Sequence, residues 1–110
     1  MHTLLILTPG HFHAALVLRE HHSSLSDDIY VYSPPGPELD RFLEIVESFN
    51  NRGTNPTRWR INVYRGEDSL EELLKQKKGD IAVLAGKNNT KMEYINILNR
   101  AGLAILADKP

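Results

Sequence analysis

The stretch Asp80–Ala107, DIAVLAGKNNTKMEYINILNRAGLAILA, decides the fold that we predict for this chain. It opens with a short apolar run, continues with a segment of helical period that stops at Gly102, and closes with a second apolar run. Two apolar runs joined by an amphipathic helix are typical of a β-α-β unit, in which the strands are parallel and buried on both faces. We therefore expect strands over Asp80–Ala85 and Leu103–Ala107, and a helix over Thr90–Arg100.

The same alternation extends back to the N-terminus. The apolar and β-branched runs predict strands at Thr3–Thr8, Asp28–Ser33 and Trp59–Tyr64. The segments of helical period predict helices at His11–Glu20, Glu38–Asn50 and Ser69–Lys78, the last with a C-terminal glycine signal at Gly79. Strict alternation predicts an α/β fold with right-handed crossovers: a three-layer, doubly wound, Rossmann-like parallel sheet of five strands in the order 3-2-1-4-5. We expect residues 1–110 to form one domain.

Composition excludes several classes of function. The 110 residues carry 13 Lys and Arg against 14 Asp and Glu, so no charge excess favours nucleic acid or an anionic membrane surface. There is no cysteine, which excludes disulfide scaffolds and thiolate metal sites. The N-terminal apolar run, Leu4–Leu7, is too short for a signal peptide or a membrane span. We expect a cytoplasmic protein.

The first predicted strand-to-helix loop contains a partial nucleotide fingerprint. A G-x-G-x-x-G match would need glycines at positions 8, 10 and 13; Gly10 is present, and Thr8 and His13 occupy the other two. We expect Thr8, Gly10 and the backbone of His11, Phe12 and His13 to face a pyrophosphate, with a plain turn as the alternative. The His11-x-His13 pair lacks a third ligand, so we expect no metal site.

The second predicted strand ends at Ser33, where NAD-binding folds usually place an acid that binds the adenosine ribose. A serine hydroxyl can meet either a ribose hydroxyl or a 2′-phosphate. We expect Ser33 to face the ribose, with the start of a plain turn as the alternative, and Arg41 to be a solvated surface charge rather than a contact to a 2′-phosphate. The cofactor prediction is NAD or NADP, and the absence of any cofactor also stays open.

A family resemblance rests mainly on the last thirty residues. Asn88 follows the predicted fourth strand, Ala101-Gly102 closes the next helix, and Asp108-Lys109-Pro110 follows the fifth strand. This order resembles the N-terminal nucleotide-binding domain of the Gfo/Idh/MocA oxidoreductases, in which a loop asparagine, a helix ending in Ala-Gly and a Glu-Lys-Pro motif occupy these places. Lys87 and Lys91 replace the proline and histidine of the family's loop.

The resemblance implies the nucleotide-binding portion of an NAD(P)-dependent oxidoreductase. It implies cofactor contacts near the nicotinamide for Asn88 and Lys109, and a role in proton transfer for Lys109. Family members continue past Lys-Pro into a substrate domain. The resemblance therefore implies a truncated domain that is not catalytically competent alone, with a small-molecule substrate only in a full-length parent.

Two alternatives remain. One is a stand-alone Rossmann-like module that binds a nucleotide or a partner. The other is a degenerate response-regulator receiver domain, which needs acids after the first strand, where this chain has Thr8-Pro9-Gly10. We also expect homo-oligomers to form through the exposed edge of the fifth strand, because an uncovered strand edge tends to pair.

Overall fold

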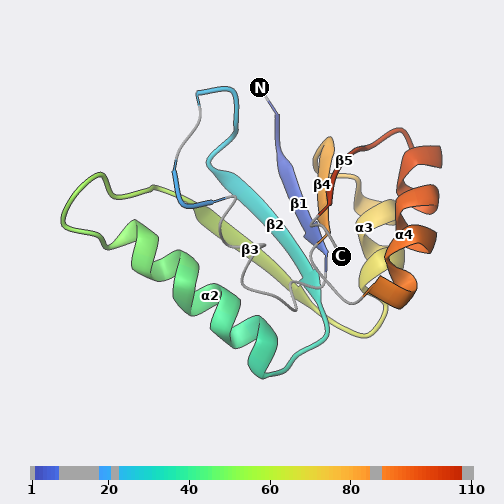
Figure 1. The fold of residues 1–110 in the computed structure, drawn as a ribbon, viewed down its shortest axis with the longest axis horizontal. Helices are drawn as coiled ribbons and strands as arrows, with labels where there is room; N and C mark the ends of the chain where they lie inside the picture. Colours follow the sequence, from blue (N-terminus) through green and yellow to red (C-terminus); the bar gives the residue numbers. More distant parts are fainter. Residues whose placement is uncertain (1, 8–17, 21–22, 85–87, 108–110) are drawn as a thin grey trace.

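The computed structural model describes residues 2–7, 18–20, 23–84 and 88–107. Within them, five parallel strands form one sheet in the order β3-β2-β1-β4-β5 (Figure 1). The strands are β1 (Leu4–Leu7), β2 (Asp28–Ser33), β3 (Arg60–Arg65), β4 (Ile81–Leu84) and β5 (Ala104–Ala107), and the helices are α2 (Pro37–Asn50), α3 (Ser69–Gln76) and α4 (Asn88–Arg100). The predicted fold class and strand order are confirmed. The helix predicted at His11–Glu20 lies largely outside the described residues.

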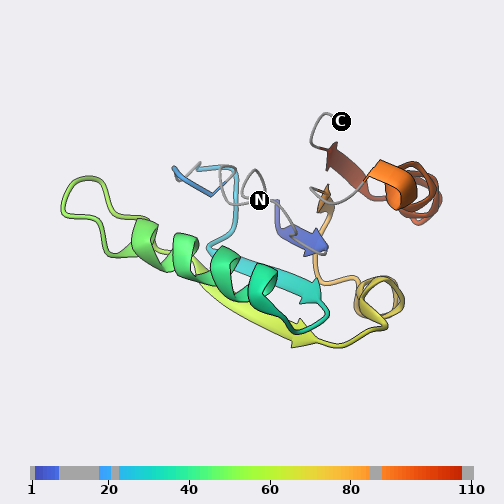
Figure 2. The same ribbon diagram turned by 60° about the horizontal axis from the view of Figure 1, so that its bottom comes forward.

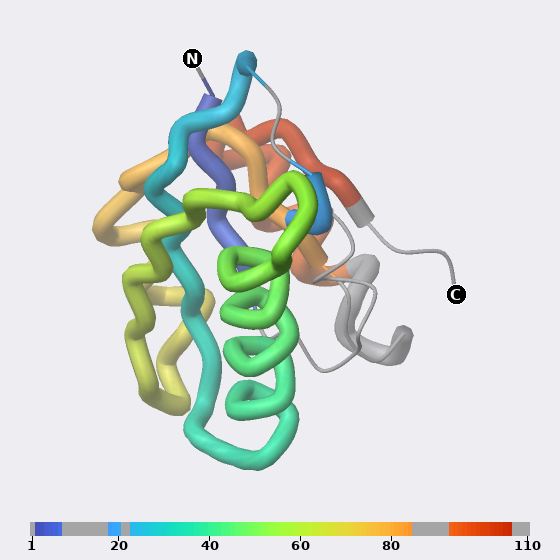
Figure 3. Tube along the Cα trace, turned by 90° about the vertical axis from the view of Figure 1, so that its left-hand side faces the viewer, coloured from blue at the N-terminus to red at the C-terminus, as the bar shows by residue number. Residues whose placement is uncertain are grey.

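Strand β1 lies at the centre of the sheet, and every one of its side chains is apolar and buried. Leu4 and Ile6 point to one face of the sheet, where they join the cluster that α2 covers through Leu39, Phe42 and Val46. Leu5 and Leu7 point to the other face, where they join the cluster of α3 and α4. The sheet thus separates α2 from the other two helices, and Figures 2 and 3 show these layers from two further directions. Burial on both faces explains why β1 carries no polar residue.

The loop from α2 to β3 is fastened by the side chain of Asn50. Its Oδ1 accepts hydrogen bonds from the Trp59 backbone N–H at 3.0 Å and from the Thr57 hydroxyl, and its Nδ2 donates to the Trp59 carbonyl at 3.0 Å. Trp59 was predicted as the first residue of this strand, but the strand begins one residue later and ends at Arg65; Trp59 lies just before it and is 4% exposed. Its indole N–H donates to the Leu18 carbonyl at 2.6 Å. These bonds hold the start of β3 against the segment that precedes β2.

Helix α3 ends earlier than predicted, and the glycine signal assigned to Gly79 is wrong. Lys77 adopts the left-handed conformation with φ of 43°, and its N–H donates to the Leu73 carbonyl at 2.9 Å. Gly79 is required by close approach instead: a Cβ atom there would lie 2.5 Å from the Thr3 carbonyl oxygen. At the end of α4 the predicted stop is confirmed, because Gly102 has φ of 87°.

The start of β1 is tied to the start of β4 at the edge of the sheet where the strands begin. The Thr3 carbonyl accepts hydrogen bonds from the N–H groups of Asp80 and Ile81 at 3.1 and 3.3 Å. In return, Asp80 accepts one hydrogen bond from the Thr3 N–H at 2.8 Å and another from His2 Nδ1 at 2.5 Å. The bond from His2 is the main cause that lowers the pKa of Asp80 below its ordinary value, and the Thr3 N–H adds to it. This network fixes the register of the β1–β4 pair, where the sheet reverses its order.

Candidate functional site at the carboxyl edge of the sheet

The carboxyl ends of the five strands lie along one edge of the sheet, because all five strands are parallel. Chain order runs outward from β1 in both directions, to β2 and β3 on one side and to β4 and β5 on the other. In open parallel sheets, ligands bind beyond the carboxyl ends of the strands at the point where the strand order reverses, which in this sheet lies between β1 and β4. Helices α2, α3 and α4 each begin at this edge, so their free N–H groups face the same region. We call it the carboxyl edge.

Ser33 is the predicted site residue that the structure describes most fully. It is the last residue of β2 and is only 6% exposed. Its hydroxyl donates to the Pro34 carbonyl at 2.9 Å, and its own carbonyl accepts the Gly66 N–H at 3.0 Å. The hydroxyl proton is therefore already used in a hydrogen bond within the chain, and the oxygen can only accept a hydrogen bond from a ligand.

The turn from β3 to α3 is compact and internally bonded. The Tyr64 hydroxyl donates to Asp68 Oδ1 at 2.8 Å, and the Ser69 hydroxyl donates to the Gly66 carbonyl at 2.7 Å. The hydrogen bond to Asp68 is the largest cause that raises the pKa of Tyr64 above its ordinary value, so Tyr64 stays a neutral donor. Gly66 leaves no room for a side chain, because a Cβ atom would lie 2.8 Å from the Tyr64 ring. The turn is therefore a tightly packed, internally bonded segment beside the end of β2.

Arg65 lies directly opposite Ser33 in the β2–β3 register, and sequence reasoning missed it as a site residue. Its side chain is exposed and forms no ion pair with any side chain that the structure describes. Arg41 is also exposed on α2, in agreement with its prediction as a surface charge. The signal that could have identified Arg65 is its place as the last residue of a strand next to β2.

The other predicted site residues are less fully described. Asn88 was expected in a loop, whereas the backbone places it as the first residue of α4, at the carboxyl edge. The structure thus brings Ser33 and the backbone of Asn88 to the same edge of the sheet. The side chain of Asn88 is outside the described part of the chain. Also outside it are the predicted cofactor contacts Thr8, Gly10, His11, Phe12, His13 and Lys109. Their roles stay predictions.

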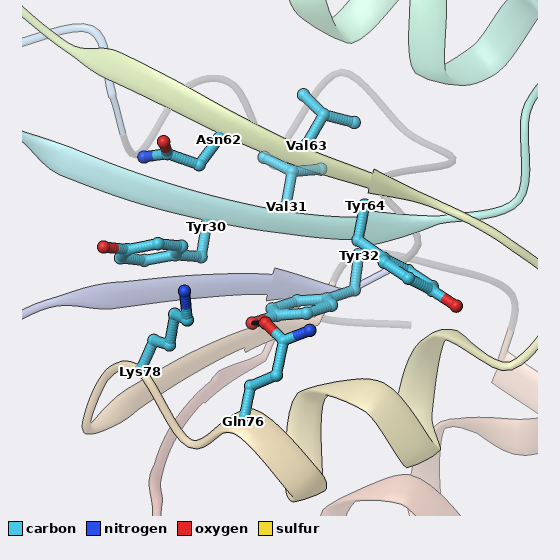
Figure 4. Close-up of a pocket in the computed structure, with 8 residues that line it drawn as sticks. All are labelled: Tyr30, Val31, Tyr32, Asn62, Val63, Tyr64, Gln76 and Lys78. Carbon is cyan, nitrogen blue, oxygen red and sulfur yellow. Dashed lines mark hydrogen bonds between the residues drawn. The ribbon is translucent and has the colours of Figure 1, made fainter.

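A hollow lies on the sheet face that packs against α3, between strands β2 and β3 and the end of that helix (Figure 4). It has a volume of about 220 Å³ and is lined by Tyr30, Val31, Tyr32, Asn62, Val63, Tyr64, Gln76 and Lys78. The Tyr32 hydroxyl donates to Gln76 Oε1 at 2.8 Å, and Lys78 Nζ lies 5.4 Å from the centre of the Tyr30 ring. Burial raises the pKa of Tyr32 above its ordinary value. Tyr64 donates to Asp68 and Asn62 donates to the Ile29 carbonyl, so several polar groups of the hollow are already engaged, and it is a weaker candidate than the carboxyl edge.

Two features are absent from the described part of the chain. Among the residues that the structure describes, no group of three or more His, Cys, Asp or Glu side chains is placed to hold a metal ion. No helix within the described ranges is both long enough and apolar enough to cross a bilayer.

Comparison with known proteins gives one informative match. The crystal structure of a "putative oxidoreductase" from Parabacteroides merdae ATCC 43184 superposes on this chain with a TM-score of 0.97 and 46% sequence identity. The match covers 99% of this chain and 25% of that chain, so this sequence spans about a quarter of the length of the solved protein. No family model matches the chain, and no curated protein matches it. The sheet order and this likeness together make the chain an α/β Rossmann-like module that is related to an oxidoreductase.

Proposed function

We propose that this chain is the adenine-dinucleotide-binding portion of an NAD(P)-dependent oxidoreductase of the Gfo/Idh/MocA type. The observation that carries the proposal is the reversal of strand order between β1 and β4, because open parallel sheets bind their ligands beyond the strand ends at such a reversal. The 46% identity to a quarter of the "putative oxidoreductase" structure independently supports the oxidoreductase part of the proposal.

The donors at the carboxyl edge suit a dinucleotide. Helices α2 and α4 begin there, and N-terminal N–H groups bind phosphate oxygens. In this proposal Gly10 and the backbone of His11–His13 face the pyrophosphate, and the end of β2 at Ser33 faces the adenosine. Asn88 and Lys109 lie toward the nicotinamide. When bound, the nicotinamide would supply hydride acceptance or donation.

The chain's own chemistry in this proposal is proton transfer by Lys109. A lysine in a site that excludes water has a lowered pKa, because burial disfavours the charged ammonium, and it then serves as an acid or a base near neutral pH. The substrate in the proposal is a small molecule held mainly by the part of the longer protein that this chain does not match. Turnover by the 110 residues alone is not expected.

Titration calorimetry of the chain with NAD⁺, NADH, NADP⁺ and NADPH tests the proposal. We expect at least one of them to bind, and Gly10→Val to weaken that binding, because the added side chain separates the backbone from the pyrophosphate. Gly53→Ala is the matched control, since a Cβ atom at Gly53 meets nothing within 4 Å. If none of the four binds, the proposal fails and a partner-binding module becomes the better account.

A further inference from the structure

The paired ends of β2 and β3 place a serine next to an arginine. Ser33 and Arg65 are register partners, so they lie on neighbouring strands about 5 Å apart and on the same side of the pleated sheet. They are also the last residues of their strands, so the pair lies at the carboxyl edge itself.

This position lacks the group that a ribose requires. A dinucleotide without a 2′-phosphate is held here by a carboxylate that accepts hydrogen bonds from the ribose hydroxyls. At the end of β2 stands Ser33, whose hydroxyl donates to Pro34 and offers a ribose only an uncharged lone pair in place of a carboxylate. No carboxylate belongs to the terminal register pair of β2 and β3.

Arg65 supplies a positive charge at this position, where an NAD site would have a negative carboxylate. Its side chain is exposed and has no ion-pair partner among the described residues, so its guanidinium is available to a ligand. A guanidinium presents a planar fork of N–H donors that matches a phosphate in a bidentate way, which an ammonium cannot do. Arg60, at the other end of β3, is by contrast committed to Asp28, with two hydrogen bonds of 2.9 Å.

Four carboxylates lie near enough in sequence to compete. Asp68 is engaged, because it accepts the Tyr64 hydroxyl. Glu67 lies in the turn after Arg65, and Glu38 and Asp40 lie in the first turn of α2; all three are exposed. A ribose held by one of these three exposed carboxylates would give the reverse preference, so the two assignments predict opposite results.

We propose that Arg65, beside Ser33, selects a dinucleotide that carries a 2′-phosphate, so that the carboxyl edge binds NADP(H) in preference to NAD(H). This inference rests on the proposed function and assigns the specificity of the same site. Ser33 contributes no hydrogen bond to the phosphate, because its proton is donated to Pro34; its role in the proposal is a small, uncharged side chain that leaves space for the phosphate next to the guanidinium.

The test compares ligands that differ only in the 2′-phosphate. The chain is titrated calorimetrically with NADPH and NADH, and with adenosine 2′,5′-bisphosphate and 5′-AMP. We expect each 2′-phosphorylated ligand to bind at least about tenfold more tightly than its partner, which is the effect of one charged hydrogen-bonded pair. Arg65→Ala is expected to remove that difference while leaving the affinity for NADH unchanged, and Arg65→Lys to restore only part of it.

Arg100→Ala is the matched control, because it removes the same charge from an exposed position at the far end of α4. Circular dichroism checks that each variant keeps its fold. Equal or tighter binding of NADH, or an equal loss of both affinities in Arg65→Ala, overturns the inference and leaves the proposed function standing. Failure of both dinucleotides to bind overturns the proposed function and this inference with it.

Discussion

Replacing Gly79 with alanine tests the packing that fixes the β1–β4 pair. A Cβ atom at Gly79 would lie 2.5 Å from the Thr3 carbonyl oxygen and 2.9 Å from Leu5 Cδ2. The first distance is 0.9 Å short of the 3.4 Å at which ordinary contacts begin. The obstacle is backbone rather than the end of a flexible side chain. The Thr3 carbonyl also accepts the N–H groups of Asp80 and Ile81, so it cannot move without straining both bonds.

The magnitude follows from two opposing effects. Forcing a methyl group into a packed site costs about 1–3 kcal/mol, and each weakened hydrogen bond costs about 1 kcal/mol more. The loss of backbone freedom in the unfolded chain returns about 0.4–1 kcal/mol. With both hydrogen bonds to Thr3 weakened, we expect Gly79→Ala to lower the free energy of unfolding by about 2–4.5 kcal/mol.

Urea denaturation measures this change, with Gly53→Ala as the matched control. Gly53 has open space around its Cα atom, so the same substitution there is expected to be neutral or to stabilise by up to about 1 kcal/mol. Equal denaturation midpoints for the two variants, with equal slopes, would refute the reasoning on close approach at Gly79.

Three further substitutions test other parts of the structure. Trp59→Phe leaves the buried Leu18 carbonyl without its indole donor and is expected to cost about 1–3 kcal/mol in urea denaturation; a change below about 0.5 kcal/mol would contradict the importance of that bond. The pKa of Asp80 is lowered in the folded state, so its stabilising contribution is complete above pH about 4 and is lost as the pH falls through the folded pKa. Asp80→Asn should therefore reduce stability at pH 6, by under about 1 kcal/mol for so exposed a pair, and have a smaller effect at pH 2.5; an equal effect at both values would exclude ionic pairing. Leu106 on edge strand β5 is 47% exposed, and Leu106→Lys should reduce self-association measured by light scattering. A monodisperse wild-type monomer would contradict self-association through this edge.

The fold could be predicted from the sequence because periodicity is strong where burial is complete. The apolar run at β1 is buried on both faces, and the bounds of β2 agree with the predicted ones. The helical stripe of α2 also packs as expected, with Leu39, Phe42 and Val46 buried. These elements are specified by local pattern, so no long-range information is needed to find them.

The errors arose where a contact distant in sequence decides the conformation. Gly79 resembles a helix stop in the sequence, yet it is required by the carbonyl of Thr3, which lies 76 positions away. Likewise Arg65 gains interest only when the register places it opposite Ser33. The predicted strand order placed these two strands side by side, but the predicted third strand stopped at Tyr64, so neither its last residue nor its register with β2 was identified.

Nuclear magnetic resonance of the isotope-labelled chain, titrated with NADPH, tests the central claim most directly. Binding at the carboxyl edge predicts shifts in the backbone amides of Ser33, Gly36, Gly66 and Asn88, where strands end and helices begin. Gly79 and Gly102, near the opposite edge, should stay unchanged. Shifts confined to those two glycines, or to the tyrosine-lined hollow, would contradict a dinucleotide site at the carboxyl edge.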